Sequence, residues 1–264
     1  MAGFAGALAL GADTLEMDVA MTRDDVVVVS HDPALHPAIT RTPDGAWIAR
    51  PGPSIRSLQV AELAGYDVGR ILTGSTYAAA FPDQVPCDGE RIPLLEHVLR
   101  IDARARFNIE LKTFPLQPGL TVDGQTMADA VAAVVDATET VARITVQSFD
   151  WRGPRHLRRT RPDIRLAWLT RAAILPQARA WWEGPHPADY GGSVPRAVAA
   201  EGGPIWAPEH VDLTQASVAE AHGLGLRVIP WTVNRPDEMR RLIGWGIDGL
   251  ITDRPDLAHA VMAA

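Results

Sequence analysis

The chain has 264 residues, of which 47% are hydrophobic and 22% charged, enough to bury the core of one large domain or two small ones. A net charge of −7 without a basic cluster argues against a nucleic-acid-binding surface. A single cysteine, Cys87, excludes an internal disulfide framework and a cysteine-rich zinc site. No apolar run approaches the length of a membrane span, and the N-terminus lacks the basic segment of a signal peptide. We therefore expect a cytoplasmic protein without stable membrane insertion.

The first elements of the chain are a helix at about 2–10, a strand at 13–19 and a second β-rich run at 26–31. The stretch from 33 to about 90 is different, because it is rich in proline and glycine and has little apolar periodicity. A short helix is predicted there, near 58–64. We interpret this stretch as an insertion rather than a domain of its own, so residues 1–264 are predicted to form a single domain.

From residue 105 onward, β-rich runs alternate with helical stretches such as 127–138 and 236–246. This alternation is typical of βα units around a parallel sheet. Asn234 is the predicted N-cap of the helix that begins near Pro236, and Gly246 is predicted to close that helix in the C′ position. Seven core strands are predicted in all: 13–19, 105–112, 144–149, 165–170, 204–211, 227–233 and 248–253.

The fold predicted from this pattern is an α/β TIM (β/α)8 barrel, which needs eight strands. The helix at about 2–10 comes before the first predicted strand. We therefore expect the eighth strand to precede this helix, in a segment that the sequence lacks.

Two acids lie two residues apart in the strand predicted at 13–19. Glu16 and Asp18 share one face of that strand, while Leu15 and Met17 take the other. Two carboxylates that point into a barrel are costly unless a cation or a base pairs with them, and hard divalent cations prefer such oxygen clusters. The alternative is a surface strand whose acids are solvated.

The strand predicted at 105–112 repeats the pattern. Asn108, Glu110 and Lys112 share one face. Glu110 is a candidate third carboxylate for a metal held by the two acids of the earlier strand, and Lys112 would face an anion on that metal. The alternative is a buried Glu110–Lys112 ion pair with a structural role.

His31 ends the run at 26–31, and active sites of barrels form at the carboxyl ends of their strands. Its ordinary pKa suits proton transfer, so His31 is a candidate catalytic residue; the alternative is a loop histidine. Gln147 and Trp231 lie at or near strand ends and are candidates for substrate binding, although an aromatic residue there is usually part of the core. The other histidines lack the spacing of metal ligands, and we interpret them as surface or core residues: His36, His97, His156, His186, His210, His222 and His259.

Taken together, these motifs resemble the glycerophosphodiester phosphodiesterase family. The segment GADTLEMDVAMTRDDVVVVSHD (11–32) resembles the family's signature of an acid-x-Asp strand, a short hairpin and a His-Asp pair. The family's later blocks are matched in order by NIELK (108–112), TVQSFD (145–150), PWTVN (230–234) and DGLITDRPD (248–256).

The resemblance implies a barrel that uses a divalent cation, Mg²⁺ or Ca²⁺, to hydrolyse small glycerophosphodiesters to glycerol 3-phosphate and an alcohol. It implies Glu16, Asp18 and Glu110 as metal ligands. It also implies His31 as one of two catalytic histidines and Lys112 as a phosphate-binding residue.

The sequence departs from the family in two places. The family's hairpin usually has Asp-Gly, whereas this chain has Asp24 and Asp25, so we expect a non-glycine residue at positive φ at a cost of about 1 kcal/mol. Family members also open with a His-Arg-Gly strand and a Pro-Glu-Asn-Thr turn, and this sequence begins at the residues that follow that turn. We therefore expect an N-terminally truncated member that lacks one catalytic histidine and one arginine and is slow or inactive. The alternative is a non-catalytic barrel that binds a metal or a phosphodiester.

Overall fold

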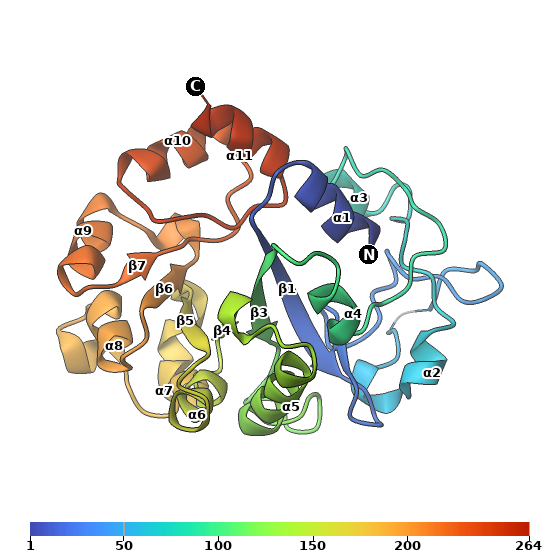
Figure 1. The fold of residues 1–264 in the computed structure, drawn as a ribbon, viewed down its shortest axis with the longest axis horizontal. Helices are drawn as coiled ribbons and strands as arrows, with labels where there is room; N and C mark the ends of the chain where they lie inside the picture. The colour runs from blue at the N-terminus through green and yellow to red at the C-terminus, as the bar shows by residue number, and fades with distance from the viewer. Residues whose placement is uncertain (50, 264) are drawn as a thin grey trace.

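The computed structural model describes residues 1–49 and 51–263 (Figure 1). Among these residues, seven strands form one sheet in the order β2-β1-β3-β4-β5-β6-β7. The first pair, β1 and β2, is antiparallel, and every other neighbouring pair is parallel. The strands are β1 (Thr14–Met21), β2 (Val27–Val29), β3 (Arg106–Leu111), β4 (Ile144–Ser148), β5 (Arg165–Thr170), β6 (Ile205–Pro208) and β7 (Arg227–Val228).

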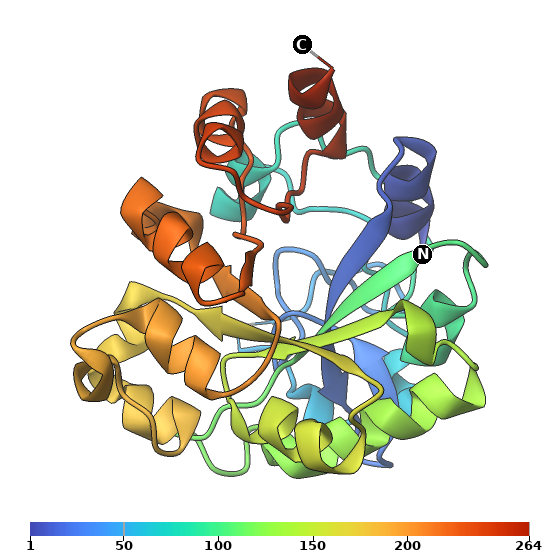
Figure 2. The same cartoon turned by 60° about the vertical axis from the view of Figure 1, so that its left-hand side comes forward.

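The sheet is curved, and most of the helices lie along its outside (Figures 1 and 2). The α-helices are α1 (Ala2–Ala9), α2 (Val60–Leu63), α3 (Thr76–Ala80), α4 (Leu95–Leu99), α5 (Gly124–Ala137), α6 (Arg152–Thr160), α7 (Ala178–Trp182), α8 (Val194–Ala200), α9 (Gln215–Gly223), α10 (Pro236–Gly244) and α11 (Pro255–Met262). Short 3-10 turns are η1 (Ile55–Ser57), η2 (Val141–Arg143), η3 (Ala172–Gln177), η4 (Pro187–Tyr190) and η5 (His210–Asp212). Within the described residues, no helix is long and apolar enough to cross a membrane.

Alternation of side chains along β1 and β3 separates the core from the site. Leu15, Met17 and Val19 are buried in one cluster with side chains of β3 and α5. The intervening residues of β1 therefore point to the opposite, inner face of the sheet. The parallel register places Asp18 directly beside Glu110. The pattern read from the sequence thus brings the acids of two strands to one face.

The predicted strand at 248–253 is not a strand in the structure. Its backbone still runs beside the segment after β7, because the N–H of Ile251 donates to the carbonyl of Pro230 at 2.9 Å. The carbonyl of Ile251 then accepts from the N–H of Val233 at 2.9 Å. In a regular parallel ladder, this carbonyl would accept from the N–H of the residue before Val233. This extra residue interrupts the ladder, as a β-bulge does.

Two other predicted strands are shorter than expected. β6 ends at Pro208 and β7 ends at Val228, two residues before Pro230. Proline has no N–H to give to a ladder, so continuous pairing stops near such residues. An isolated parallel bridge between Glu209 and Trp231 continues the alignment beyond these strand ends.

Local predictions at turns and helix ends were confirmed in two places and wrong in one. Asp25 has φ 61° and Gly246 has φ 84°, as expected for the hairpin and for the C′ residue that follows the C-cap of α10. The N-cap of α10 is Arg235 rather than Asn234. The side chain of Asn234 instead forms hydrogen bonds with Thr252 and Asp253.

The segment between β2 and α4 contains η1, α2 and α3, joined by irregular chain. It lies on the side of β1 that carries β2 (Figure 1). The loop after α1 meets α11, because a Cβ placed on Gly11 would lie 2.9 Å from the ring of His259. The first and last helices are therefore neighbours across the open side of the sheet (Figure 2).

Candidate active site

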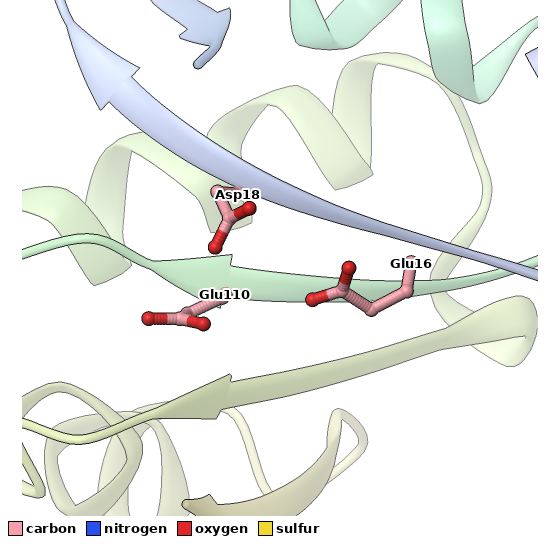
Figure 3. A group of neighbouring side chains, drawn as sticks. All are labelled: Glu16, Asp18 and Glu110. Atoms are coloured by element: carbon pink, nitrogen blue, oxygen red, sulfur yellow. The ribbon is translucent and has the colours of Figure 1, made fainter. Parts of the chain in front are cut away.

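Three carboxylates from two neighbouring strands converge on the inner face of the sheet. Glu16 and Asp18 come from β1 and Glu110 from β3, and Figure 3 shows all three turned toward a common space. One oxygen from each can be chosen so that these atoms lie within 4.8 Å of one another. Such a group could hold a metal ion.

Lys112 joins two of these carboxylates. Its Nζ lies 2.9 Å from Oε1 of Glu110 and 3.0 Å from Oδ1 of Asp18. All three side chains are largely buried, with exposed fractions of 13% for Lys112, 8% for Glu110 and 16% for Asp18. One lysine therefore faces three acids in a poorly solvated place.

The pKa values reflect this excess of acidic groups. Burial raises the pKa of Glu16 to about 8, and the nearby charge of Asp18 adds to the rise. Burial also raises the pKa of Glu110 to about 8, although Lys112 opposes the shift. Burial by itself would lower the pKa of Lys112, but the charges of Glu110 and Asp18 raise it to about 12. Lys112 thus keeps its positive charge, whereas ionising Glu16 and Glu110 costs free energy.

Gln147 on β4 borders the three carboxylates. Its Nε2 donates to Oε1 of Glu16 at 2.9 Å, and its register position on the sheet is beside Glu110. The other amide atom, Oε1, is buried and accepts no hydrogen bond from the described residues. A buried acceptor without a partner is costly. This oxygen is therefore free to accept a hydrogen bond from a bound molecule.

His31 stands at the open side of the site. The N–H of Ser30 donates to the carbonyl of Asp18 at 3.0 Å, which fixes the loop after β2 beside β1. The Nδ1 of His31 lies 2.8 Å from Oδ1 of Asp32, and 72% of the His31 side chain is exposed. The hydrogen bond to Asp32 raises the pKa of His31, and the charges of Lys112 and Asp18 also reach the ring.

An apolar wall continues the inner face beyond Gln147. The rings of Phe149 and Trp231 meet edge to face at 5.4 Å, and both pack against buried side chains of β5 and β6. The indole N–H of Trp231 donates to the carbonyl of Ala207 at 2.9 Å, which fixes the ring. The structure thus brings the three predicted carboxylates, Lys112 and Gln147 together. His31 lies on the loop after β2, and Trp231 belongs to the apolar wall beyond Gln147.

Asp253 borders the carboxylates although the sequence did not predict it as a site residue. Its charge contributes to the raised pKa of Glu16, although burial is the larger cause. Its Oδ2 accepts from Nδ2 of Asn234 at 2.8 Å, and Thr252 donates to the other side of the same amide at 3.0 Å. An acid at the carboxyl end of the last predicted strand was the available signal, since that is the end where barrel sites form.

The side chains present fit a hard divalent cation. The donors are carboxylate oxygens, which Mg²⁺ and Ca²⁺ prefer, and one lysine does not balance three acids. A cation between them would offset the burial and, secondarily, the charge of Asp18 that raise the pKa values of Glu16 and Glu110.

A parallel α/β sheet that collects carboxylates, a lysine and a histidine near the carboxyl ends of its strands defines a barrel enzyme suited to an anionic substrate and a divalent cation. The model of the glycerophosphoryl diester phosphodiesterase family matches residues 1–257, and the chain belongs to this family.

Named relatives and solved structures agree with this assignment. Glycerophosphodiester phosphodiesterases of Caldanaerobacter subterraneus and Bacillus subtilis are each 26% identical to the chain, over 97% and 95% of it and 88% and 76% of their own lengths. A structure from Silicibacter pomeroyi, assigned to the glycerophosphoryl diester phosphodiesterases, has a TM-score of 0.88 and 35% identity, covering 100% of this chain and 87% of its own. A phosphodiesterase of Oleispira antarctica, solved with sn-glycerol-3-phosphate, has a TM-score of 0.72 at 18% identity, covering 99% of this chain and 89% of its own. The predicted barrel-type fold is thereby confirmed.

Proposed function

We propose that this protein hydrolyses glycerophosphodiesters to glycerol 3-phosphate and an alcohol, using a divalent cation held by Glu16, Asp18 and Glu110. The observation that carries the proposal is the convergence of these three carboxylates with Lys112 in a chain of this family. The names of the relatives support the substrate class.

When bound, the cation would neutralise a non-bridging phosphate oxygen and offset the charge that develops in the transition state. Mg²⁺ and Ca²⁺ both suit the carboxylate set. The charged Nζ of Lys112, next to the same carboxylates, would bind a second phosphate oxygen.

The remaining site residues have distinct roles in this proposal. With Nδ1 of His31 engaged by Asp32, its Nε2 is the atom available for proton transfer. The raised pKa favours the protonated ring, so we assign His31 as the general acid that protonates the leaving alcohol. Gln147 accepts a hydrogen bond from the substrate at Oε1, and Trp231 packs against its glycerol part.

The test is a coupled assay of glycerol 3-phosphate release, after dialysis against a chelator and readdition of Mg²⁺ or Ca²⁺. We expect cation-dependent release that is lost in Glu110→Gln and kept in Glu96→Gln, an exposed glutamate of α4 paired with Arg100. Cation binding without any release would support the non-catalytic barrel instead. A chain that binds no divalent cation would refute the proposed hydrolysis and the metal-binding form of the alternative.

Three proposals concern the chain as a whole. Residues 1–264 form a single domain with an insertion at about 33–90, which one cooperative thermal transition would support. Nucleic acid is not a partner and the protein does not insert stably into membranes, which gel-shift assays and carbonate-washed vesicle sedimentation would check. The location is cytoplasmic, which fractionation of the native cells would test.

A further inference from the structure

Three alternate strands of the parallel sheet begin with an arginine. Arg106 is the first residue of β3, Arg165 of β5 and Arg227 of β7. These strands are parallel, so the arginines lie at the amino end of the barrel, whereas the candidate active site lies toward the carboxyl end. On β3, the four residues from Arg106 to Glu110 span about 13 Å at roughly 3.3 Å per residue. The arginines therefore belong to a different place from the three carboxylates.

All three arginines occupy inner-face positions of their strands. Side chains along a strand alternate between its two faces, so residues separated by an even number share a face. Arg106 lies four residues before the β3 carboxylate of the candidate site. Arg165 lies two residues before Ala167, and Arg227 lies four residues before Trp231. Ala167 and Trp231 belong to the apolar wall on the inner face, so the arginines point toward the barrel axis.

The register of the sheet places the three arginines at one level. Through β4, Arg165 is in register with Asn108, two residues beyond Arg106. Through β6, Arg227 is in register with Ala167, two residues beyond Arg165. A barrel of eight strands with a shear of about 8 advances by roughly one residue per strand, so a step of two residues over two strands keeps the same level. The three side chains therefore form one layer of the barrel interior, contributed by alternate strands.

The arginines of this layer are exposed and lack acidic partners. Among the residues that the structure describes, none of the three forms an ion pair. Four acids next to the strand starts at this end of the barrel are engaged by other groups: Asp13, Asp102, Asp163 and Asp248. Three like charges at one level repel one another, and a bound anion would offset this repulsion.

The spacing of the layer suits a tetrahedral anion. Neighbouring strands lie about 4.8 Å apart, so arginines two strands apart begin roughly 10 Å from each other. An arginine side chain is long enough to cover half of that span, and the three guanidinium groups can reach one group between them. Each guanidinium presents a fork of N–H donors that matches phosphate oxygens. A phosphate group has enough oxygens for several such forks, whereas a carboxylate has only two.

We propose that Arg106, Arg165 and Arg227 form a second binding site, which takes a phosphate group at the amino end of the barrel. The ligand is a phosphate-bearing anion, either free in solution or the headgroup of an anionic lipid. This site shares no residue with the one proposed to hydrolyse glycerophosphodiesters, so it stands whether or not that function is correct.

The test titrates inorganic phosphate into the wild type and into Arg165→Gln by calorimetry, with a chelator present and at low ionic strength. Without a cation, the three carboxylates of the candidate active site disfavour an anion there. We expect the wild type to bind phosphate and Arg165→Gln to bind it at least about 10-fold more weakly, because a hydrogen-bonded charge pair is lost. The control is Arg159→Gln, which removes an exposed arginine of α6 and should bind phosphate as the wild type does.

Arg106→Gln gives an independent check by thermal unfolding. Phosphate should raise the Tm of the wild type and raise that of Arg106→Gln much less, because only a ligand bound to the folded state stabilises it. No phosphate binding by the wild type, equal affinities in Arg165→Gln and the wild type, or an equal loss in Arg159→Gln would overturn the inference.

Sedimentation with phosphatidylglycerol vesicles distinguishes the two sources of the phosphate group. Retention of the wild type that is lost in Arg165→Gln would assign the site to a lipid headgroup. Binding of inorganic phosphate without retention on the vesicles would assign it to a free anion. Retention that is equal in Arg165→Gln and the wild type would exclude the lipid source.

Discussion

Replacing Glu110 by glutamine tests whether the carboxylates are held together for a cation, because the metal-free and metal-bound proteins should respond in opposite directions. Burial raises the pKa of Glu110 to about 8, against the opposing charge of Lys112. Glutamine keeps the size of the side chain and an oxygen that can accept from Nζ of Lys112, which lies 2.9 Å from Glu110. The substitution therefore removes the charge and little else.

The direction in which the unfolding free energy changes with pH follows from proton binding. In the metal-free protein, the folded state holds a proton on Glu110 more tightly than the unfolded state does, because the folded pKa is the higher one. That stabilisation is complete below pH 4.5 and is lost as the pH rises through about 8. One pKa unit corresponds to about 1.4 kcal/mol, so the whole shift amounts to roughly 5 kcal/mol if it belongs to Glu110 alone. Because the pKa of the neighbouring Glu16 is also raised to about 8 and the two groups titrate together, we expect a change of roughly 1–3 kcal/mol.

Urea unfolding at pH 5 and pH 8.5 in the presence of a chelator measures this change. Relative to Glu110→Gln, the metal-free wild type should lose roughly 1–3 kcal/mol of unfolding free energy between the two pH values. At pH 8.5, a cation at 100 times its Kd should stabilise the wild type by about 2.7 kcal/mol and the variant by much less.

The control is Glu96→Gln, which removes an exposed charge and should follow the wild type at both pH values. If the difference in unfolding free energy between Glu110→Gln and the wild type is the same at both pH values, the buried charge of Glu110 does not limit stability and the idea is refuted. Equal stabilisation by the cation would remove Glu110 from the ligand set.

Two further predictions address the chemistry and the hairpin. His31→Ala should lower the turnover number by roughly 10²–10⁴-fold with cation binding unchanged in calorimetry, and near-normal turnover would contradict its role as general acid. Asp25→Gly should stabilise the protein by about 0.5–1 kcal/mol and raise Tm by a few degrees, because Asp25 has φ 61°. The ion pair of Asp25 with Arg56 is largely exposed, so its loss offsets little of this gain. A lower Tm would contradict the prediction and show that the ion pair outweighs the backbone strain.

The convergence of carboxylates was predictable because strand geometry has a fixed period. Alternation puts Glu16 and Asp18 on one face of β1, and a parallel register then brings Asp18 beside Glu110. The position of Gln147 follows by the same rule, because Gln147 on β4 pairs in register with Glu110 on β3. A site on adjacent strands can be inferred from two-residue spacing once the strands are known to be neighbours.

The side-chain contacts of the irregular segment between β2 and α4 could not be predicted in this way. His36 and Tyr77 are 41 residues apart in the sequence, and irregular chain between them has no period that fixes which side chains meet. The strand predicted at 248–253 is absent for a related reason. The apolar composition of this segment suits a strand, but one extra residue in its pairing with Val233 breaks the ladder. Composition indicates that a segment is extended, whereas pairing depends on partners that only the fold supplies.

Lys112 gives the site a further property. Its ammonium group occupies the space between Glu110 and Asp18, the carboxylates proposed to bind the cation. A divalent cation that takes oxygens from both must weaken these hydrogen bonds, and the lysine stays charged because its pKa is about 12. Its donors would then be free for an anionic oxygen on the same cation. In the proposed function, a bound cation would therefore release Lys112 from its ion pairs with Glu110 and Asp18 and leave its ammonium group to bind the phosphate.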